Sequence, residues 1–356
     1  MNVWRLEGAP FTSNWSATAT HNQAGVWGID GCKTTNVKPA GLLAVNDTLY
    51  LGVTCVGIGR QSDGQHRQSN IAGGLAVSTD FGETFRPAAA KFFTGRLASP
   101  QLINRGKGHS AASDHFVYAH FCYGIDNKSF WDANSHVLVG RVPEHEILSR
   151  ASWRFYTAAG GWDADDAEAA PVMSFPDSLS QNQATYSQTL DRYLIANTAY
   201  LDPVHRRPVS YRNPSDGSQK GIQLSMFESP TPWGPWALFY DWTQPCPGGR
   251  CLPPFYTPSF PAPFVDDAHG PLLGWAAPCD PPGGMHRPWV CQRYALNGSG
   301  WHAHDDGSGF AGYALNLQRV ELVLQAKSGG VAAAAAGTAD EGASGAMPKD
   351  GQGSLV

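Results

Sequence analysis

The stretch at residues 221–242, GIQLSMFESPTPWGPWALFYDW, decides the fold class. Ile222, Leu224 and Met226 follow the period-two pattern that is typical of a half-buried strand, and residues 237–240 supply a second apolar run. Three prolines and a glycine lie between the runs, so no regular ladder passes through the turn. The stretch therefore predicts a β-hairpin. We expect Trp233 and Trp236 to cover the end of a sheet, an interpretation favoured over a sugar-stacking platform.

Composition extends this prediction to the whole chain. The 356 residues include 40 Gly and 26 Pro, and only 15% of them are charged, which favours many short strands and tight turns over helices. With 42% hydrophobic residues the chain can form a packed core. A formal charge of −5 and the lack of a long Lys or Arg run argue against nucleic-acid and anionic-membrane partners.

A repeated pair of strands appears after residue 41. The first members of the pairs begin near Leu49, Phe116, Tyr193 and Pro271, and their partners begin near Gly74, His136, Ile222 and Val290. Four such copies predict a β-propeller with long surface loops, and a β-sandwich is the runner-up fold. A short helical segment is predicted at residues 144–150, after Pro143.

Several ordered motifs carry a family resemblance. They are FESPTPWGPWALFY from Phe227, KPAGLLAVNDTLYL from Lys38, GRLASPQLIN from Gly95, HVLVGRVPEHEIL from His136 and QATYSQTLDRYLIAN from Gln183. Together they resemble the proteins that carry domain of unknown function 4185 (DUF4185). The resemblance implies a five-bladed β-propeller of the glycoside-hydrolase or sialidase-like type, and some relatives are similar to endo-D-arabinanases. Fold analogy does not by itself give a substrate.

The resemblance also bears on the two ends of the chain. VWGIDGC from Val26 is similar to the phrase that ends the first blade in the family, but a strand that normally precedes it is missing or eroded. Residues 1–40 are therefore expected to form a partial first blade, and residues 41–325 a single propeller domain. Residues 326–356 are small and polar without aromatic residues, and this tail is expected to be disordered.

The segment STDFGETF at residues 78–85 resembles the Asp box of sialidase-like propellers, with Phe in place of Trp. We expect the Asp80 carboxylate to accept amide hydrogens within the turn. Gly82 permits a positive φ there, and Phe85 is expected to pack under the blade. The predicted role of this segment is structural.

The cysteines, the glycosylation sequons and the N-terminal residues bear on the cellular compartment of the protein. The N-terminal residues show neither a basic start nor an apolar core, and no transmembrane run occurs, so no signal peptide is predicted in this chain. The family resemblance and four acceptor sequons nevertheless favour an extracellular protein that has lost its leader. Cys246 and Cys251 have a spacing that a disulfide could close, whereas a zinc site would lack a second ordered pair.

Catalytic candidates are sought at the propeller axis. Glycoside cleavage needs two carboxyl groups, one protonated and one ionised. Asp30, in the Trp-Gly-rich phrase before the first clear strand, is the predicted base or nucleophile, and Asp166 or Glu168 is the predicted acid. Single Asp or Glu residues in Gly-rich loops are more often turn formers. The predicted substrate-binding residues are Lys38, His109, Trp131, Asp132, Gln183 and Tyr186.

Two functions remain open at this stage. The first is a glycoside hydrolase that acts on a cell-wall or extracellular polysaccharide, and the alternative is a non-catalytic carbohydrate-binding propeller with an eroded active site. No zinc-protease, α/β-hydrolase, P-loop or dinucleotide motif is present. We expect a polysaccharide or oligosaccharide as ligand, a monomer, and no cofactor, although Asp and His residues leave a divalent cation at the axis open.

Overall fold

A computed structural model of the chain describes residues 4–7, 16–19, 36–60, 66–88, 92–121, 134–179, 183–201, 221–245, 256–262, 265–266, 272–278 and 313–319. Within these ranges the regular elements are β-strands and four 3₁₀ turns, η2 (Gly95–Leu97), η3 (Lys107–His109), η4 (Arg150–Ser152) and η5 (Asp166–Glu168). No helix in the described ranges is long and apolar enough to cross a membrane. The all-β prediction is confirmed.

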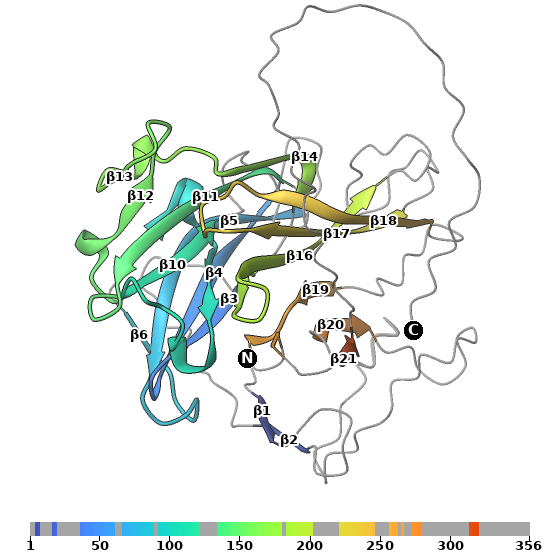
Figure 1. Ribbon diagram of the computed structural model, residues 1–356, viewed down its shortest axis with the longest axis horizontal. Coiled ribbons are helices and arrows are strands. Elements are labelled where there is room, and N and C mark those ends of the chain that lie inside the picture. Colours follow the sequence, from blue (N-terminus) through green and yellow to red (C-terminus); the bar gives the residue numbers. More distant parts are fainter. Residues whose placement is uncertain are drawn as a thin grey trace, which may run out of the picture. The chain divides into compact units, whose positions relative to one another are not determined.

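The described strands form five sheets (Figure 1). Sheet 1 holds β1 (Trp4–Glu7) and β2 (Ser16–Ala19). Sheet 2 holds β3 (Asn36–Val45), β4 (Thr48–Arg60), β5 (His66–Ser78), β6 (Arg86–Pro87) and β7 (Phe93–Thr94). Sheet 3 holds β8 (Pro100–Leu102), β10 (Phe116–Phe121), β11 (Asn134–Pro143), β12 (Arg154–Tyr156), β13 (Trp162–Asp163) and β14 (Met173–Leu179).

The last two sheets complete the series. Sheet 4 holds β9 (Asn104–Arg105), β15 (Thr185–Ser187), β16 (Arg192–Leu201), β17 (Gly221–Ser229) and β18 (Ala237–Pro245). Sheet 5 holds β19 (Tyr256–Ser259), β20 (Leu272–Pro278) and β21 (Tyr313–Arg319). Neighbouring strands pair antiparallel, except that β9 and β15 pair in parallel.

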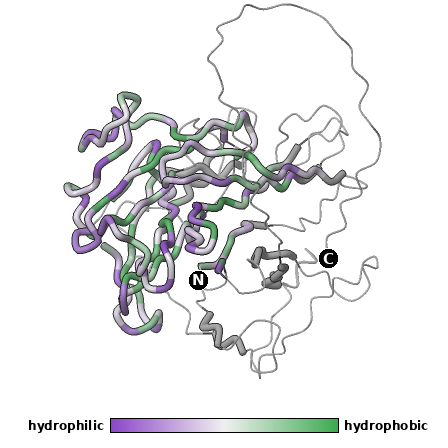
Figure 2. Tube along the Cα trace, viewed as in Figure 1, coloured by the Kyte–Doolittle hydropathy of each residue, from purple (hydrophilic) through white to green (hydrophobic). Residues whose placement is uncertain are grey.

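Side chains on both faces of the central sheets are buried. From β10, Val117, Ala119 and Phe121 point into a core shared with sheet 2, whereas Tyr118 packs into a second core shared with sheet 4. The other faces of sheets 2 and 4 are buried as well, in two further apolar cores, of which the one on sheet 2 includes Val53. Apolar residues accordingly follow the strands and hydrophilic residues gather at the turns (Figure 2). Successive sheets covered on both faces are the arrangement of propeller blades, so the propeller prediction agrees with the packing.

Most of the predicted strand pairing is confirmed. The hairpin predicted from residues 221–242 is β17 and β18, and β4–β5, β10–β11 and β16–β17 are the predicted pairs. Trp233 and Trp236 pack against the core between sheets 3 and 4, as the packing interpretation requires.

Two local predictions are wrong. The predicted partner of β20 is wrong, because β19 and β21 occupy its two edges, and the residues near Val290 lie outside the described residues. Residues 144–150 form turns rather than a helical segment, and the 3₁₀ turn η4 begins only at Arg150. The indole N–H of Trp153 donates to the Ile147 carbonyl (3.1 Å), a contact that helps to hold this turn against the core.

The turn at residues 78–85 has the predicted contacts. The Asp80 carboxylate accepts hydrogen bonds from the Thr84 amide (2.9 Å) and from the Thr84 and Ser78 hydroxyls. Gly82 has a φ of 88°, and Phe85 is buried. These hydrogen bonds lower the pKa of Asp80 to about 2. Because β3 begins at Asn36, the strand crosses the predicted boundary at residue 40, and the predicted tail lies outside the described residues.

Candidate functional site

The first strands of sheets 2, 3 and 4 meet. The Gln183 side-chain amide donates to the Leu42 carbonyl of β3 (3.0 Å) and to the Leu102 carbonyl of β8 (2.8 Å). Asn104 donates to the same Leu42 carbonyl (3.0 Å). The Thr185 hydroxyl of β15 donates to the Phe260 carbonyl just after β19 (2.7 Å). These side chains tie together the strands that line a propeller axis, at about the middle of β3.

The amino-terminal ends of these strands form one candidate site. Lys38 lies near the start of β3 and is half-buried, and burial lowers the pKa of its amine. Gln101 of β8 is buried, and its side-chain amide donates to the Ser99 hydroxyl (3.3 Å). Amines and amides donate hydrogen bonds to neutral oxygen acceptors, which suits recognition of hydroxyl groups.

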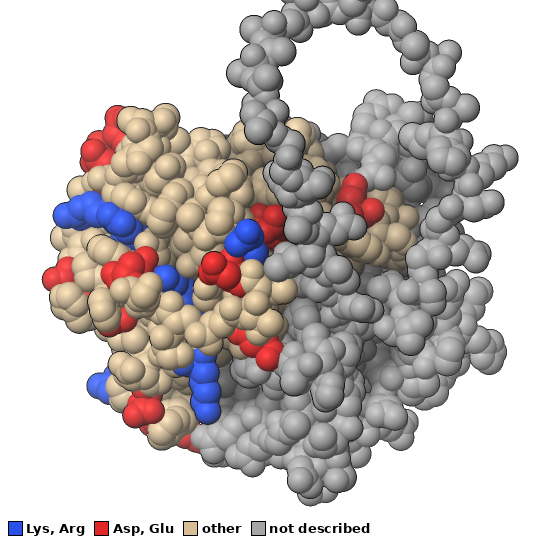
Figure 3. All heavy atoms as spheres, in the orientation of Figure 1, with Lys and Arg blue, Asp and Glu red and all other residues tan. Residues whose placement is uncertain are grey.

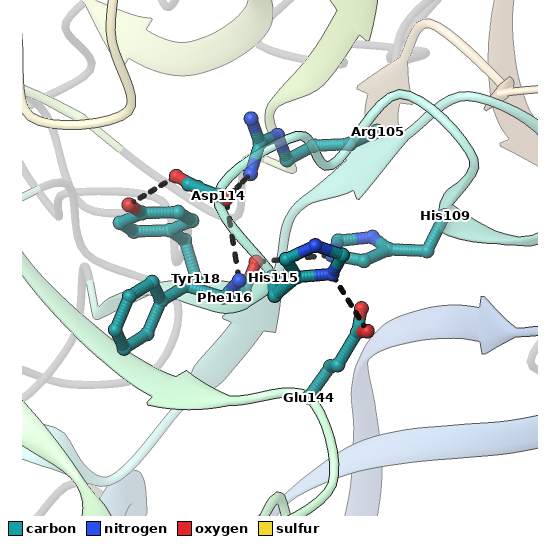
Figure 4. Close-up of polar contacts among 7 residues, drawn as sticks. All are labelled: Arg105, His109, Asp114, His115, Phe116, Tyr118 and Glu144. Atoms are coloured by element: carbon teal, nitrogen blue, oxygen red, sulfur yellow. Dashed lines mark hydrogen bonds and ion pairs between the residues drawn. The ribbon is translucent and has the colours of Figure 1, made fainter.

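A second polar cluster lies at the other end of β3 (Figure 4). The Asp114 carboxylate forms an ion pair with the buried Arg105 guanidinium and accepts a hydrogen bond from the Tyr118 hydroxyl (2.7 Å) and the Phe116 amide (3.2 Å). Burial opposes ionisation of Asp114, but the bonds from Tyr118 and Arg105 outweigh it and lower its pKa. Burial raises the pKa of Tyr118 above its usual range and that of Tyr193 to about 12.

Two histidines complete this cluster. His109 is buried at a φ of 67°, its Nε2 lies 3.0 Å from the Phe116 carbonyl, and burial lowers its pKa. His115, at a φ of 58°, is exposed and places Nδ1 3.1 Å from the Glu144 carboxylate. Because the carboxylate, both phenols and one ring nitrogen of His109 are engaged within the protein, we interpret the cluster as a link between sheets 3 and 4.

The predicted substrate-binding residues divide between the two ends. Lys38 lies at the start of β3. His109 lies at its end, because the Asn46 amide donates to the Gly108 carbonyl (3.1 Å). Eight residues of extended strand span roughly 26 Å. Tyr186 pairs with Arg105 and donates to Asp191 (2.6 Å), so it belongs with His109. The structure therefore does not bring Lys38 together with His109 or Tyr186. Gln183 lies between these two ends, where its side chain hydrogen-bonds to the backbone of both β3 and β8.

The predicted acids lie near an outer strand of sheet 3. Asp166 and Glu168 are in η5, which lies beside β12, and Asp166 forms an ion pair with Arg150 (2.6 Å). No described contact joins them to the first strands of the sheets. Asp30, Trp131 and Asp132 lie outside the described residues, so the distance between the predicted carboxyl groups is untested.

The described residues place limits on metal and polyanion binding. In the described ranges no group of three or more His, Cys, Asp or Glu is arranged to hold a metal ion. Basic and acidic side chains are interspersed on the face shown in Figure 3, with no broad basic patch in view. Cys55 is buried and takes part in a disulfide.

Sequence reasoning missed Arg105, Asp114 and Tyr118. The signal that could have found them is the segment RGKGHSAASDHFVY, where Gly-rich turns surround ionisable residues between two short strands. It also missed Arg141, whose place in β11 between apolar residues is unusual for a charged side chain.

Comparison with known proteins gives distant likenesses. No family model matches the chain and no curated protein does, so the relation to DUF4185 remains a resemblance. The chain is similar in structure to a thermostable family-43 glycoside hydrolase, with 13% identity, a TM-score of 0.47 and coverage of 90% of this chain and 82% of that one. A family-43 arabinoxylan arabinofuranohydrolase from Bacillus subtilis shows 9% identity, a TM-score of 0.25 and coverage of 67% and 58%. Since these TM-scores lie below 0.5, they assign no substrate and no residue.

Proposed function

We propose that the chain is a carbohydrate-active β-propeller that binds a neutral glycan at the amino-terminal ends of the first strands of its sheets. The observation that carries the proposal is the set of ties from Gln183 and Asn104. They join three sheets near the middle of β3, and Lys38 lies four residues before Leu42, toward the start of the same strand. Small ligands usually bind at concave sites, and the place where the first strands of several sheets converge is the proposed location of such a site.

The chemistry of this end supports a glycan. Lys38 is half-buried, and a partly desolvated amine donates strong hydrogen bonds to hydroxyl oxygens. The formal charge of −5 disfavours densely charged polyanions such as nucleic acids. We also propose an extracellular location, because the Cys55 disulfide is typical of oxidising compartments. The distant likeness to glycoside hydrolases agrees with the proposal but does not carry it.

Hydrolysis is the catalytic form of the proposal, with Asp30 as base or nucleophile. A second carboxyl group must then stand across the scissile bond. The described geometry gives little support to Asp166 for this role, because Arg150 holds it beside β12. A non-catalytic carbohydrate-binding propeller is the second candidate, and the amide- and amine-rich ends of the first strands favour it.

The test is a glycan array followed by a reducing-end release assay on every glycan that binds. Lys38→Met keeps the length of the side chain and removes its charge, and it should weaken binding roughly tenfold, about 1.4 kcal/mol. Lys107→Met, at the other end of β3, is the matched control and should bind like the parent. Unaltered binding by Lys38→Met would move the site elsewhere. No binding to any neutral glycan would overturn the proposed function.

A further variant tests whether the protein hydrolyses the glycans that it binds. If the parent releases reducing ends, Asp30→Asn should abolish release by orders of magnitude while binding persists. Full release by Asp30→Asn would remove that residue from the mechanism. Binding without release by the parent would select the binding-module form.

A further inference from the structure

Two arginines lie side by side on the face of sheet 3 that turns toward sheet 4. Arg141 of β11 and Arg154 of β12 are directly opposed in the strand register, so their Cβ atoms are roughly 5 Å apart and their side chains share a face. Like charges in this position destabilise a sheet. Both residues are half-buried, which adds to the cost of holding the two charges together.

Neither arginine has a carboxylate partner among the described residues. The described arginine ion pairs are Arg105–Asp114, Arg150–Asp166 and Arg192–Glu228. Arg154 donates to the Ala151 and Trp153 carbonyls, 2.7 and 2.9 Å away. The Nε of Arg141 is buried without a hydrogen-bond partner in the same ranges. Asp114 is the carboxylate that bonds the nearby Tyr118 hydroxyl, and it is already paired with Arg105.

Aromatic rings hold the Arg141 guanidinium in place. Its central carbon lies 4.4 Å from the ring centre of Phe116 and 4.3 Å from that of Trp162. Stacking on ring faces fixes the plane of the guanidinium, and part of its N–H edge interacts with the Tyr118 hydroxyl. Beyond it, Trp162 packs edge-on against Tyr156 and Trp233, with ring centres 5.2 and 5.5 Å away. All three rings are half-exposed.

We infer that this surface, formed by Arg141, Arg154, Tyr156 and Trp162, binds the carboxylate of an acidic saccharide built of hexuronate residues. A planar guanidinium fork matches a carboxylate, and half-exposed rings pack against the C–H groups of a sugar ring. An anion here also relieves the repulsion between the two arginines. Because the formal charge of the chain is −5, one carboxylate per sugar suits it better than a polyphosphate.

The surface lies on β11, β12 and β13, the strands of sheet 3 farthest from β8, whereas the proposed glycan site is at β8 and the start of β3. The inference rests on the proposed function only for the class of ligand. The two can therefore fail independently: binding of neutral glycans without binding of uronides would remove this inference alone.

The experiment is calorimetric titration of the full chain with trigalacturonic acid, with its methyl ester as a neutral match and with a trinucleotide. We expect the acid to bind at least tenfold more tightly than the ester, and high salt to weaken it. Arg141→Gln should remove that preference. Arg150→Gln is the matched control, because Arg150 also stacks on an aromatic ring, 5.0 Å from the centre of Phe155, but is paired with Asp166.

A second variant protects the test against misfolding. Arg141→Lys keeps the charge and the stem but loses the fork, so it should lose most of the preference for the acid and retain the melting temperature of the parent. Equal binding of acid and ester, no binding of the acid, tighter binding of the trinucleotide, or equal losses in Arg141→Gln and Arg150→Gln would each overturn the inference.

Discussion

Gly52 lies directly against the backbone of Pro100, so that a Cβ added at position 52 would stand 2.2 Å from the Pro100 carbonyl oxygen. Gly41 and Gly73 meet the same chain segment in the same way, at 2.6 Å from the Leu102 amide nitrogen and the Ala98 carbonyl oxygen. Three glycines on β3, β4 and β5 thus allow β8 of sheet 3 to lie on the backbone of sheet 2. This close approach requires residues without side chains.

Gly52→Ala should therefore destabilise the protein, because the atom in the way is backbone and cannot rotate aside. We expect a loss of about 3 kcal/mol in the free energy of unfolding, measured by urea denaturation. Gly161→Ala is the control, since the added Cβ would meet the Thr157 hydroxyl at 4.0 Å, an ordinary contact. Equal stability of the two variants would mean that sheets 2 and 3 do not pack this closely.

Asp114→Ala should destabilise the protein by leaving a buried guanidinium without its partner. The Arg105 side chain is 8% exposed, and removal of one member of such a pair costs about 3 kcal/mol. The double variant Arg105→Met with Asp114→Ala should recover part of that loss, because it buries no unpaired charge. A double-mutant cycle by urea denaturation checks this. If the double variant is less stable than Asp114→Ala by the full cost of Arg105→Met alone, the pair is not coupled.

Stability should fall as the pH drops below about 6.5, because His120 is buried between sheets 3 and 4. Its Nε2 lies 2.8 Å from the Pro232 carbonyl, its ring lies against Trp236, and burial lowers its pKa to about 4. The unfolded chain, with an ordinary histidine pKa near 6.5, therefore binds a proton that the folded chain does not bind. The contribution is complete above pH 6.5 and is lost progressively toward pH 4, to a total on the order of 3 kcal/mol.

Urea denaturation at pH 7, 6 and 5 measures this dependence. His120→Asn should show a shallower decline than the parent, although His109, whose pKa burial also lowers, retains its share. Identical slopes in parent and variant would show that the pKa of His120 is the same in the folded and the unfolded chain.

Asp80→Ala should lower the melting temperature without altering glycan binding. The carboxylate accepts bonds only within its own turn, from Ser78 and Thr84, at the outer side of sheet 2. Its lowered pKa means that this stabilisation is present above pH 4 and is lost as the pH falls through about 2. Thermal melting and glycan binding of the same sample check both halves. Lost binding with unchanged melting would assign Asp80 to the ligand site.

The long strands were predictable and the short ones that position the site were not. Residues 116–121 and 192–201 are rich in apolar side chains over most of their length, which is typical of strands buried on both faces and is visible in the sequence. β8 and β15 have three residues each, too few to show a period, so their place ahead of the longer strands could be inferred only from the family resemblance. The carboxylates of η5 are candidates for the acid because they cluster in the sequence, but the sequence does not show that Arg150 forms an ion pair with one of them.

Arg141 illustrates the same limit from the other side. From the sequence, a charged residue within an apolar strand is expected at the surface. In the structure, the Arg141 guanidinium is held by two rings, Phe116 and Trp162, which lie 25 residues before it and 21 residues after it in the chain. Such contacts between distant segments carry no local pattern.

The hydrogen bonds made by Gln183 constrain the order in which parts of the chain can fold. Its side-chain amide joins carbonyls that lie 141 and 81 residues earlier in the chain. During synthesis, sheets 2 and 3 can already meet through β8 and Asn104, but the junction that they form with sheet 4 stays open until residue 183 has emerged. Closing loops of this length is slow relative to hairpin formation. A ribosome-bound chain that ends before residue 183 should therefore expose this junction to proteases, and one that extends past β16 should protect it.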